Sequence, residues 1–187
     1  MSLVEARAAE LGKYVRAYTR PGYHMSGARM ADAQRDLRAL PCRGSYLDVG
    51  CGRGEMLEFA RSIGFATVCG TETVPDLLDG SSIVHGLAHQ LPFADGQFEV
   101  VSLFDVIEHL VPGDDEAACG ELRRVASKHI LLTANNKSSR QPNGDELHVN
   151  RRPYPEWDAL FQQWFAGAKV TWLKGRDYVS EGWKVDL

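Results

Sequence analysis

Several features that mark other protein classes are missing from this chain of 187 residues. No uninterrupted apolar run approaches the roughly 20 residues that a membrane-spanning helix needs. The early segment carries Glu5, Arg7 and Glu10, where a secretory signal would be apolar. We therefore expect a cytoplasmic protein that neither enters a membrane nor carries a secretory signal.

Paired cysteines are also missing. The four cysteines show no C-x-x-C spacing and are scattered along the chain, as small core or loop residues are. They are Cys42, Cys51, Cys69 and Cys119. This pattern is typical of a protein from a reducing compartment, which agrees with a cytoplasmic location.

The chain lacks an excess of positive charge. Its 21 lysines and arginines stand against 25 acidic residues, which gives a formal net charge of −4. Such a balance provides no global field to attract nucleic acid, so we do not expect a nucleic-acid partner. Short basic clusters at 123–124, 137–140 and 151–152 are interpreted as solvated faces.

Internal repeats, low-complexity tracts and flexible linkers are absent too. A content of 44% apolar and 25% charged residues is ordinary for a globular protein, and the length suits one domain with a full core. We therefore predict a single domain over 1–187, with an N-terminal helical cap or lid at 1–40 and a ligand-binding and catalytic core at 41–187.

The most informative segment is a glycine-rich turn. An apolar strand at Leu47–Val49 runs into Gly50, Gly52 and Gly54, and a helical pattern follows from Glu55. Such a turn lets backbone N–H groups approach a ligand closely, and the next helix directs its positive end at that ligand. The spacing differs from the dinucleotide fingerprint G-x-G-x-x-G because position 55 is Glu. The turn therefore predicts a cofactor other than NAD.

A second apolar run, Val68 to Glu72, ends in an acid 20 residues beyond Gly52. A carboxylate at the end of a strand can accept hydrogen bonds from both hydroxyls of a ribose. The combination of this acid with the glycine turn predicts a nucleoside ligand without phosphates.

Short β-rich runs alternate with helical patterns from residue 45 onward, which is typical of βαβ units on a largely parallel sheet. The predicted strands are Ser45–Val49, Phe65–Thr71, Ser82–His85, Phe98–Phe104, His129–Ala134, Ala168–Leu173 and Tyr178–Val185. The stretches around Gly80 and after Phe93 are too short for a usual crossover helix, so we predict loops there.

Three helices of the core are predicted from apolar stripes. The first follows the glycine turn, and the second carries Leu122 after a start that Asp114 or Asp115 can cap. The third has an aromatic face whose spacing favours a core stripe over a base-stacking platform. That face consists of Trp157, Leu160, Phe161, Trp164 and Phe165.

The segment before the glycine turn carries apolar side chains on one helical face. Its aromatic and neighbouring side chains could line a lid above the ligand, where aromatic faces and the exclusion of water would favour a bound cation. Ordinary helix packing is the alternative. The candidate lid residues are Tyr14, Tyr18, Tyr23, His24 and Met25.

Three further blocks make the chain resemble the class I S-adenosylmethionine-dependent methyltransferases. Leu91 to Val101 resembles the segment that leads into their fourth strand, and Asp105 to Leu110 resembles the motif that follows it. Glu121 to Val125 resembles their fourth helix. The resemblance implies a Rossmann-like α/β fold, with seven mostly parallel strands, an antiparallel last strand and helices on both faces of the sheet.

The resemblance also implies S-adenosylmethionine as cofactor and S-adenosylhomocysteine as product. The glycine turn would hold the methionine moiety, with Asp48 near its ammonium group, and Glu72 would hold the ribose. The cofactor-binding residues expected on this basis are Asp48, Gly50, Cys51, Gly52, Gly54, Glu72, Ala88, His89, Phe104 and Asp105.

One position departs from the family. An acid that holds the adenine amine is expected a few residues before Leu91, and Leu87 stands in its place. Since an exocyclic amine needs only an acceptor, backbone groups of Ala88 and His89, or the Gln90 amide, could replace that acid.

The predicted catalytic residues are His148, His109 and Glu108. Either histidine is a natural general base, because imidazole has the only unperturbed side-chain pKa near neutrality. We favour His148 because 135–150 is rich in Asn, Ser, Gly and Asp, which indicates a loop at the ligand edge of the sheet.

The spacing Asp105-x-x-Glu108-His109, with His148 further on, also resembles the metal site of small-RNA 3′-end methyltransferases and of some quinone-pathway O-methyltransferases. Two acids and two imidazoles could bind a divalent ion that lowers the pKa of a hydroxyl. Related enzymes without metal carry the same Glu-His-Leu, so no metal is expected and this four-residue site stays an alternative.

The favoured hypothesis is a methyltransferase that acts on O or N of a small polar metabolite, such as a sugar or natural-product intermediate. The first alternative is a metal-assisted RNA ribose 2′-O-methyltransferase. The second is a non-catalytic domain that binds S-adenosylmethionine. The identity of the acceptor and the oligomeric state stay open at this point.

Overall fold

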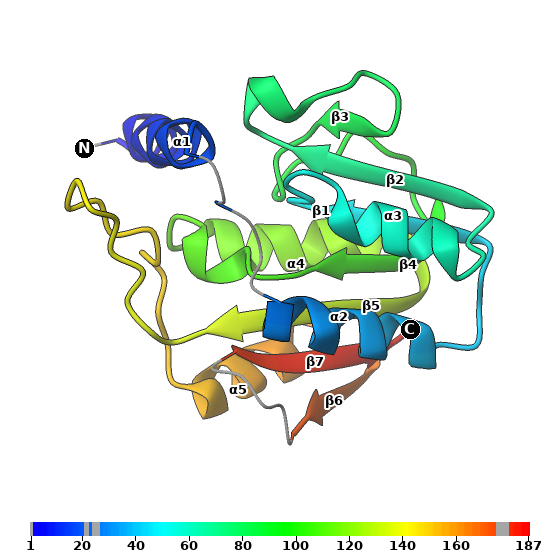
Figure 1. The fold of residues 1–187 in the computed structure, drawn as a ribbon. Helices are drawn as coiled ribbons and strands as arrows, with labels where there is room; N and C mark the ends of the chain where they lie inside the picture. Colours follow the sequence, from blue (N-terminus) through cyan, green and yellow to red (C-terminus); the bar gives the residue numbers. More distant parts are fainter. Residues whose placement is uncertain (1, 21–22, 24–26, 175–179) are drawn as a thin grey trace.

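The computed structural model of the chain describes residues 2–20, 23, 27–174 and 180–187. Within these ranges, α-helices, short 3₁₀ helices (η) and strands follow one another as in Figure 1. In chain order they are α1 (Leu3–Tyr18), α2 (Gly27–Ala39), β1 (Ser45–Val49), α3 (Glu55–Ser62), β2 (Thr67–Glu72), η1 (Pro75–Leu77), β3 (Ile83–His85), β4 (Phe98–Leu103), η2 (Ile107–His109), α4 (Asp114–Val125), β5 (Ala126–Asn135), α5 (Tyr154–Trp164), β6 (Lys169–Leu173) and β7 (Ser180–Asp186).

The strands form one sheet in the order β3-β2-β1-β4-β5-β7-β6. β1 pairs in parallel with β2 on one side and with β4 on the other, and β7 runs antiparallel to both β5 and β6. The predicted strands and the antiparallel last strand are confirmed, although β5 already begins at Ala126. The expected start of the last strand at Tyr178 lies outside the described residues. Because the strand order reverses beside β1, a crevice forms at the carboxyl ends of β1 and β4.

Helices cover both faces of the sheet and define two core clusters. α4 and α5 pack against one face, whereas α2 and α3 pack against the other (Figure 1). The aromatic stripe of α5 is confirmed as core, since Trp157, Phe161 and Phe165 are fully buried. Loops are confirmed where they were predicted: only η1 lies between β2 and β3, and residues 86–97 between β3 and β4 contain no helix.

The predicted cap of α4 is wrong. Gly113 occupies the N-cap position in the left-handed region, with φ at 101°, and no side chain caps the helix. Asp114 and Asp115 lie inside the first turn, where the helix dipole favours negative charge. Asp115 Oδ1 instead accepts a hydrogen bond from the Gly113 N–H at 2.9 Å. A glycine therefore sets the chain direction at this helix start.

The two N-terminal helices differ in position. α2 packs into the core through Ala33 and Leu37, whereas α1 lies apart from the sheet, on the side toward which the arrowheads of β1 and β2 point (Figure 1). α1 is thus placed at the carboxyl ends of the parallel strands, the edge where such sheets bind ligands.

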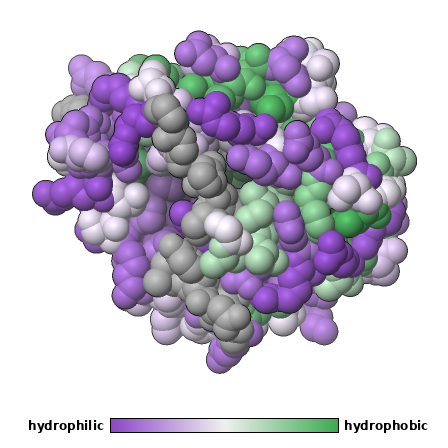
Figure 2. Space-filling model, viewed as in Figure 1, coloured by the Kyte–Doolittle hydropathy of each residue, from purple (hydrophilic) through white to green (hydrophobic). Residues whose placement is uncertain are grey.

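The surface viewed in Figure 2 is mainly hydrophilic, with apolar side chains in separate areas. On the described surface, the exposed large hydrophobic residues are Leu3, Val4 and Leu187. None of the described helices combines the length and apolarity that crossing a bilayer requires.

Candidate active site

Two adjoining cavities open in the crevice at the carboxyl ends of β1, β2 and β4. The larger has a volume of about 290 Å³ and the smaller about 130 Å³. The residues that line both are Tyr18, Tyr23, Gly50, Asp105 and His109. A ligand of two connected parts can therefore span both cavities across Gly50.

The glycine turn forms the floor of this crevice. Gly50, Gly52 and Gly54 have positive φ values of 73°, 57° and 86°, which disfavour other residues. At Gly50 a Cβ atom would also lie 2.6 Å from Val106 Cγ2. The N–H groups of Gly50 and Cys51 donate to the Thr71 carbonyl at 2.8 and 3.0 Å, which fixes the turn against β2.

Asp48, at the end of β1, lines the smaller cavity from below the glycine turn. Its Oδ1 accepts a 2.5 Å hydrogen bond from Ser102 Oγ, which in turn lies 2.6 Å from the Tyr46 hydroxyl. Burial raises the pKa of Asp48 to about 7, although the hydrogen bonds from Ser102 and Tyr46 oppose the shift. The carboxyl group therefore titrates near neutrality, where a cationic ligand can draw it into the ionised form.

Glu72, at the end of β2, lines the larger cavity and is nearly buried. Its Oε1 accepts the N–H groups of Thr73 and Val74 at 2.6 and 3.2 Å, and its Oε2 accepts the N–H of Gly52 at 3.1 Å. This carboxylate thus ties β2 to the glycine turn. Because Oε2 receives a single N–H, it retains acceptor capacity for a ligand hydroxyl.

The far wall of the larger cavity includes Leu87, Ala88 and His89. Gln90 is exposed and lines neither cavity, so its amide is not placed to replace the missing acid. An acid that sequence reasoning missed does line this cavity. Asp114 from α4 pairs there with Arg7 of α1 through two contacts, at 2.8 and 2.5 Å.

The chain bends sharply at Asp105, directly after β4 and the buried Phe104. Asp105 adopts a left-handed conformation with φ at 52°, which Asp tolerates better than most residues. Its N–H donates to Thr133 Oγ1 at 2.7 Å, and its Oδ2 lies 2.9 Å from Arg29 Nη1. The bend directs η2 under the crevice, and Arg29 brings α2 to the smaller cavity.

Glu108, His109 and His148 lie close together beside the smaller cavity. One potential ligand atom from each lies within 4.8 Å of the others, and the two imidazole rings meet edge to face with centroids 4.6 Å apart. His109 lines both cavities and His148 the smaller one, whereas Glu108 is fully buried behind them. Asp105 is not part of this group, so the structure assembles three of the four residues of the alternative metal site.

Both histidines are held by backbone carbonyls. His109 Nδ1 lies 3.0 Å from the Leu147 oxygen, and His148 Nδ1 lies 2.6 Å from the Lys137 oxygen. Since a carbonyl can only accept, each Nδ1 carries a proton and each Nε2 offers a lone pair. Glu146 shapes this loop, because its Oε1 accepts the N–H groups of Ser139 and His148 at 2.7 and 3.0 Å.

The protonation states follow from burial. Burial, together with the neighbouring His148, lowers the pKa of His109 to about 3. Burial also lowers the pKa of His148, to a smaller extent. Burial and the charge of Asp105 raise the pKa of Glu108 well above its usual range. Both imidazoles are therefore neutral at neutral pH.

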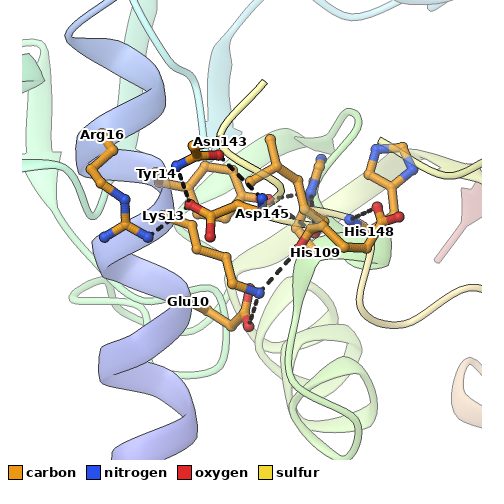
Figure 3. Close-up of polar contacts among 10 residues, drawn as sticks. Glu10, Lys13, Tyr14, Arg16, His109, Asn143, Asp145 and His148 are labelled. Carbon is orange, nitrogen blue, oxygen red and sulfur yellow. Dashed lines mark hydrogen bonds and ion pairs between the residues drawn. The ribbon is translucent and has the colours of Figure 1, made fainter. Parts of the chain in front are cut away.

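α1 reaches this site with polar side chains (Figure 3). The Tyr14 hydroxyl contacts His109 Nδ1 and lies 3.3 Å from the Leu147 carbonyl oxygen. Lys13 donates to the Glu146 carbonyl at 3.0 Å, and Arg16 pairs with Asp145 at 2.8 Å. Through these contacts α1 closes the crevice on the side of the loop 136–150.

Residues 47–131 match the family described as a methyltransferase domain. The protein has the fold of the class I S-adenosylmethionine-dependent methyltransferases. The sequence has no significant match among curated proteins.

Solved structures share this fold at low sequence identity. The 1,6-didemethyltoxoflavin-N1-methyltransferase of Burkholderia thailandensis has a TM-score of 0.75 at 14% identity, over 100% of this chain and 90% of its own. The PH0226 protein of Pyrococcus horikoshii OT3 has a TM-score of 0.71 at 18% identity, over 93% and 98%. The DhpI complex with S-adenosylhomocysteine has a TM-score of 0.72 at 14% identity, over 95% of each chain.

The crevice fits S-adenosylmethionine, the cofactor of enzymes with this fold. Asp48 titrates close to neutrality in the smaller cavity, Glu72 keeps an acceptor oxygen toward the larger one, and a Cβ atom at Gly50 would collide with Val106. The Asp48 carboxyl group suits the ammonium group of that molecule, and the acceptor oxygen of Glu72 suits its ribose. The lack of a side chain at Gly50 keeps the backbone of the turn accessible.

Most of the predicted site residues line the two cavities. Those that do are Asp48, Gly50, Cys51, Gly52, Glu72, Ala88, His89, Phe104, Asp105, His109 and His148. Gly54 lines neither cavity and is the N-cap residue of α3. Glu108 is fully buried and also lines neither cavity. Of the candidate lid residues, Tyr14, Tyr18 and Tyr23 line a cavity, whereas His24 and Met25 lie outside the described residues.

Proposed function

We propose that this protein transfers a methyl group from S-adenosylmethionine to an oxygen or nitrogen of a small polar metabolite. The observation that carries the proposal is the meeting of two neutral imidazoles, His109 and His148, at the smaller cavity that also contains Asp48 and the glycine turn. The neighbour from Burkholderia thailandensis, which is titled with bound 1,6-didemethyltoxoflavin, supports an acceptor of this class.

The cofactor is proposed to lie across both cavities. Bound there, it supplies an electrophilic methyl group on a sulfonium. We assign its methionine part to the glycine turn and Asp48, its ribose to Glu72, and its adenine to the wall of Leu87, Ala88 and His89. The preorganised turn and the exclusion of water then account for most of the expected rate enhancement.

His148 is proposed as the group that activates the acceptor. Its Nε2 lone pair can accept the proton that leaves the acceptor, because its Nδ1 is already committed to the Lys137 carbonyl. His109 is a weaker base, since its pKa is lowered to about 3, so we assign it to orienting the acceptor. Glu108, the third predicted catalytic residue, has one carboxyl oxygen within 4.8 Å of a ring nitrogen of each histidine.

We further propose that the chain acts as one domain in the cytoplasm, with residues 1–40 as a helical cap. The contacts of Tyr14, Lys13 and Arg16 with the loop 136–150 support a lid role for α1. The four cysteines are all free thiols, which agrees with a reducing compartment.

Transfer of labelled methyl groups to a panel of acceptors tests the proposal. The panel contains sugars, phenols, amines and heterocycles, with RNA oligonucleotides as a separate arm. We expect turnover with a small acceptor, and loss of that turnover in His148→Ala while S-adenosylhomocysteine still binds. Cofactor binding without turnover on any acceptor, or turnover on RNA alone, would contradict the proposal.

A further inference from the structure

Glu108 is the most unusual polar side chain of the described protein. It is fully buried, and neither of its carboxylate oxygens has a hydrogen-bond partner among the described residues. Burial of a carboxyl group without a partner is costly, and buried polar groups in native proteins are nearly always satisfied. A group that completes this side chain is therefore missing from the described contacts.

The neighbouring imidazoles offer no N–H to the ionised carboxylate of Glu108. The Nδ1–H groups of His109 and His148 both donate to backbone carbonyl oxygens, at 3.0 and 2.6 Å. Each Nε2 therefore carries a free lone pair. Two lone pairs and an ionised carboxylate are three electron-pair donors, and a positive ion placed between them would stabilise all three.

The three groups are close enough to share one ion. One donor atom from each lies within 4.8 Å of the others. An ion held at about 2.1 Å from nitrogen and oxygen would draw them to within about 4 Å, which small side-chain adjustments provide. Histidines that ligate metals commonly donate their other ring N–H to a backbone carbonyl, and both histidines here have that support.

We propose that Glu108, His109 and His148 bind one divalent transition-metal ion. Imidazole nitrogens favour first-row ions such as Co²⁺, Fe²⁺ or Zn²⁺, and two imidazoles with one carboxylate leave coordination positions open. His109 lines both cavities and His148 the smaller one, so these positions face the acceptor.

This inference rests on the proposed function and deepens it. An ion at this place changes His148 from a general base into a ligand, and it selects acceptors that offer an oxygen, such as a hydroxyl group, whose pKa the ion lowers. The acceptor class then narrows from oxygen or nitrogen compounds to hydroxyl compounds.

Titration of the chelator-treated full chain with Co²⁺ tests the site by calorimetry and by visible absorption, with Zn²⁺ as competitor. We expect one saturable site per chain, displaced by Zn²⁺. Glu108→Gln and His148→Ala should each weaken Co²⁺ binding by more than the roughly 10–100-fold that changes in supporting residues cost. The matched controls are Glu116→Gln and His85→Ala, since both residues are exposed and outside the cavities, and they should bind Co²⁺ like the parent.

Thermal unfolding of Glu108→Gln separates a ligand role from a structural one. Without metal, loss of an unpartnered buried carboxyl should leave the Tm unchanged or raise it, whereas Co²⁺ should raise the Tm of the parent only. A lower Tm of the metal-free variant would overturn the proposal.

A parallel titration with S-adenosylhomocysteine distinguishes the two proposals. A parent protein that binds S-adenosylhomocysteine but not Co²⁺, or a Glu108→Gln variant that binds Co²⁺ as well as the parent, would overturn the metal site and leave the methyltransferase proposal standing. Failure to bind S-adenosylhomocysteine would count against the proposed function itself.

Discussion

Two buried glutamates lie at the same crevice, and they differ in the hydrogen bonds that their carboxyl oxygens receive. Glu72, on the cofactor side, receives the N–H groups of Gly52, Thr73 and Val74. Glu108, on the acceptor side, receives no hydrogen bond from the described residues and faces two imidazoles that offer lone pairs.

This difference indicates which part of the site already has its polar groups hydrogen-bonded without a ligand. On the side proposed to bind the cofactor, backbone N–H groups already fix the Glu72 carboxylate, so this part of the site is preorganised. On the side proposed to bind the acceptor, Glu108, His109 and His148 each offer one possible ligand atom within 4.8 Å of the others, which is the basis of the proposed metal site. Substitutions on the two sides should therefore separate cofactor binding from chemistry.

The largest effect is expected from His148→Ala. Removal of this imidazole should lower turnover about 10²–10⁴-fold, the usual contribution of a positioned proton-transfer group. The Kd for S-adenosylhomocysteine, measured by calorimetry, should stay that of the parent because the cofactor side is untouched. His85→Ala is the control. A tenfold weaker Kd for S-adenosylhomocysteine in His148→Ala would contradict the proposal that His148 acts on the acceptor and not in cofactor binding.

Glu72→Gln should affect the opposite side. A hydrogen bond to a charged partner contributes about 1.5–3 kcal/mol, so the Kd for S-adenosylhomocysteine should rise roughly 10–100-fold. The amide would also direct a donor toward one of the three N–H groups, which lowers the Tm. Glu58→Gln, on the exposed face of α3, is the matched control. Equal affinity in Glu72→Gln and the parent would show that this carboxylate does not hold the ribose.

A smaller effect is expected from pH through Asp48. Its pKa of about 7 in the folded protein means that the carboxyl is largely neutral at lower pH and ionised above. A ligand ammonium favours the ionised form, so cofactor affinity should rise several-fold as pH increases from about 6 to about 7.5. Calorimetry across this range checks the sign. Affinity that falls over the same interval would contradict the placement of the ammonium group.

The same shift acts on stability with the opposite sign. The unfolded chain loses this proton near 3.8, whereas the folded protein keeps it until about 7. Its contribution to stability therefore decreases as pH rises between these values, and Asp48→Asn should remove both this decrease and the pH dependence of cofactor binding.

The smallest effect is expected from Tyr14→Phe on α1. The lost hydroxyl contacts His109 Nδ1 and the Leu147 carbonyl, and a typical hydrogen bond contributes about 0.5–1.5 kcal/mol. We expect a KM for the acceptor that rises a few-fold with an unchanged Kd for S-adenosylhomocysteine. Arg16→Ala removes a more exposed ion pair of the same helix and should change less. Equal effects of the two variants would show that α1 acts through general docking.

The sequence predicted the glycine turn and the acids at the strand ends well, because their signals are local. Three glycines that need positive φ, an acid that ends β1 and another that ends β2 are readable within single segments. Apolar periodicity likewise predicted the strands and the buried aromatic face of α5, since alternation and helical spacing are properties of short windows.

The acceptor side was predicted in its residues but not in its contacts. Arg29 and Asp105 form an ion pair although they lie 76 positions apart in the sequence (105 − 29). No local sequence pattern predicts such a contact. This pair, with the bend at Asp105, is why that acid does not join Glu108 and the histidines. The contact of Tyr14 with His109 depends in the same way on how α1 folds over the crevice.

The helix start at α4 shows a third limit. Asp114 and Asp115 follow the residue preferences of a cap, yet Gly113 takes that position because it can adopt a φ of 101°. The acids then become available for other partners, Asp114 for Arg7 and Asp115 for Arg152. Residue preference alone does not decide which of several suitable neighbours ends up at the cap.

Titration of the purified chain with S-adenosylhomocysteine, by calorimetry near pH 7.5, tests the central claim most directly. The account predicts saturable binding with one molecule per chain, weakened in Glu72→Gln and retained in His148→Ala. An absence of binding heat across several temperatures, from protein that unfolds cooperatively, would contradict it.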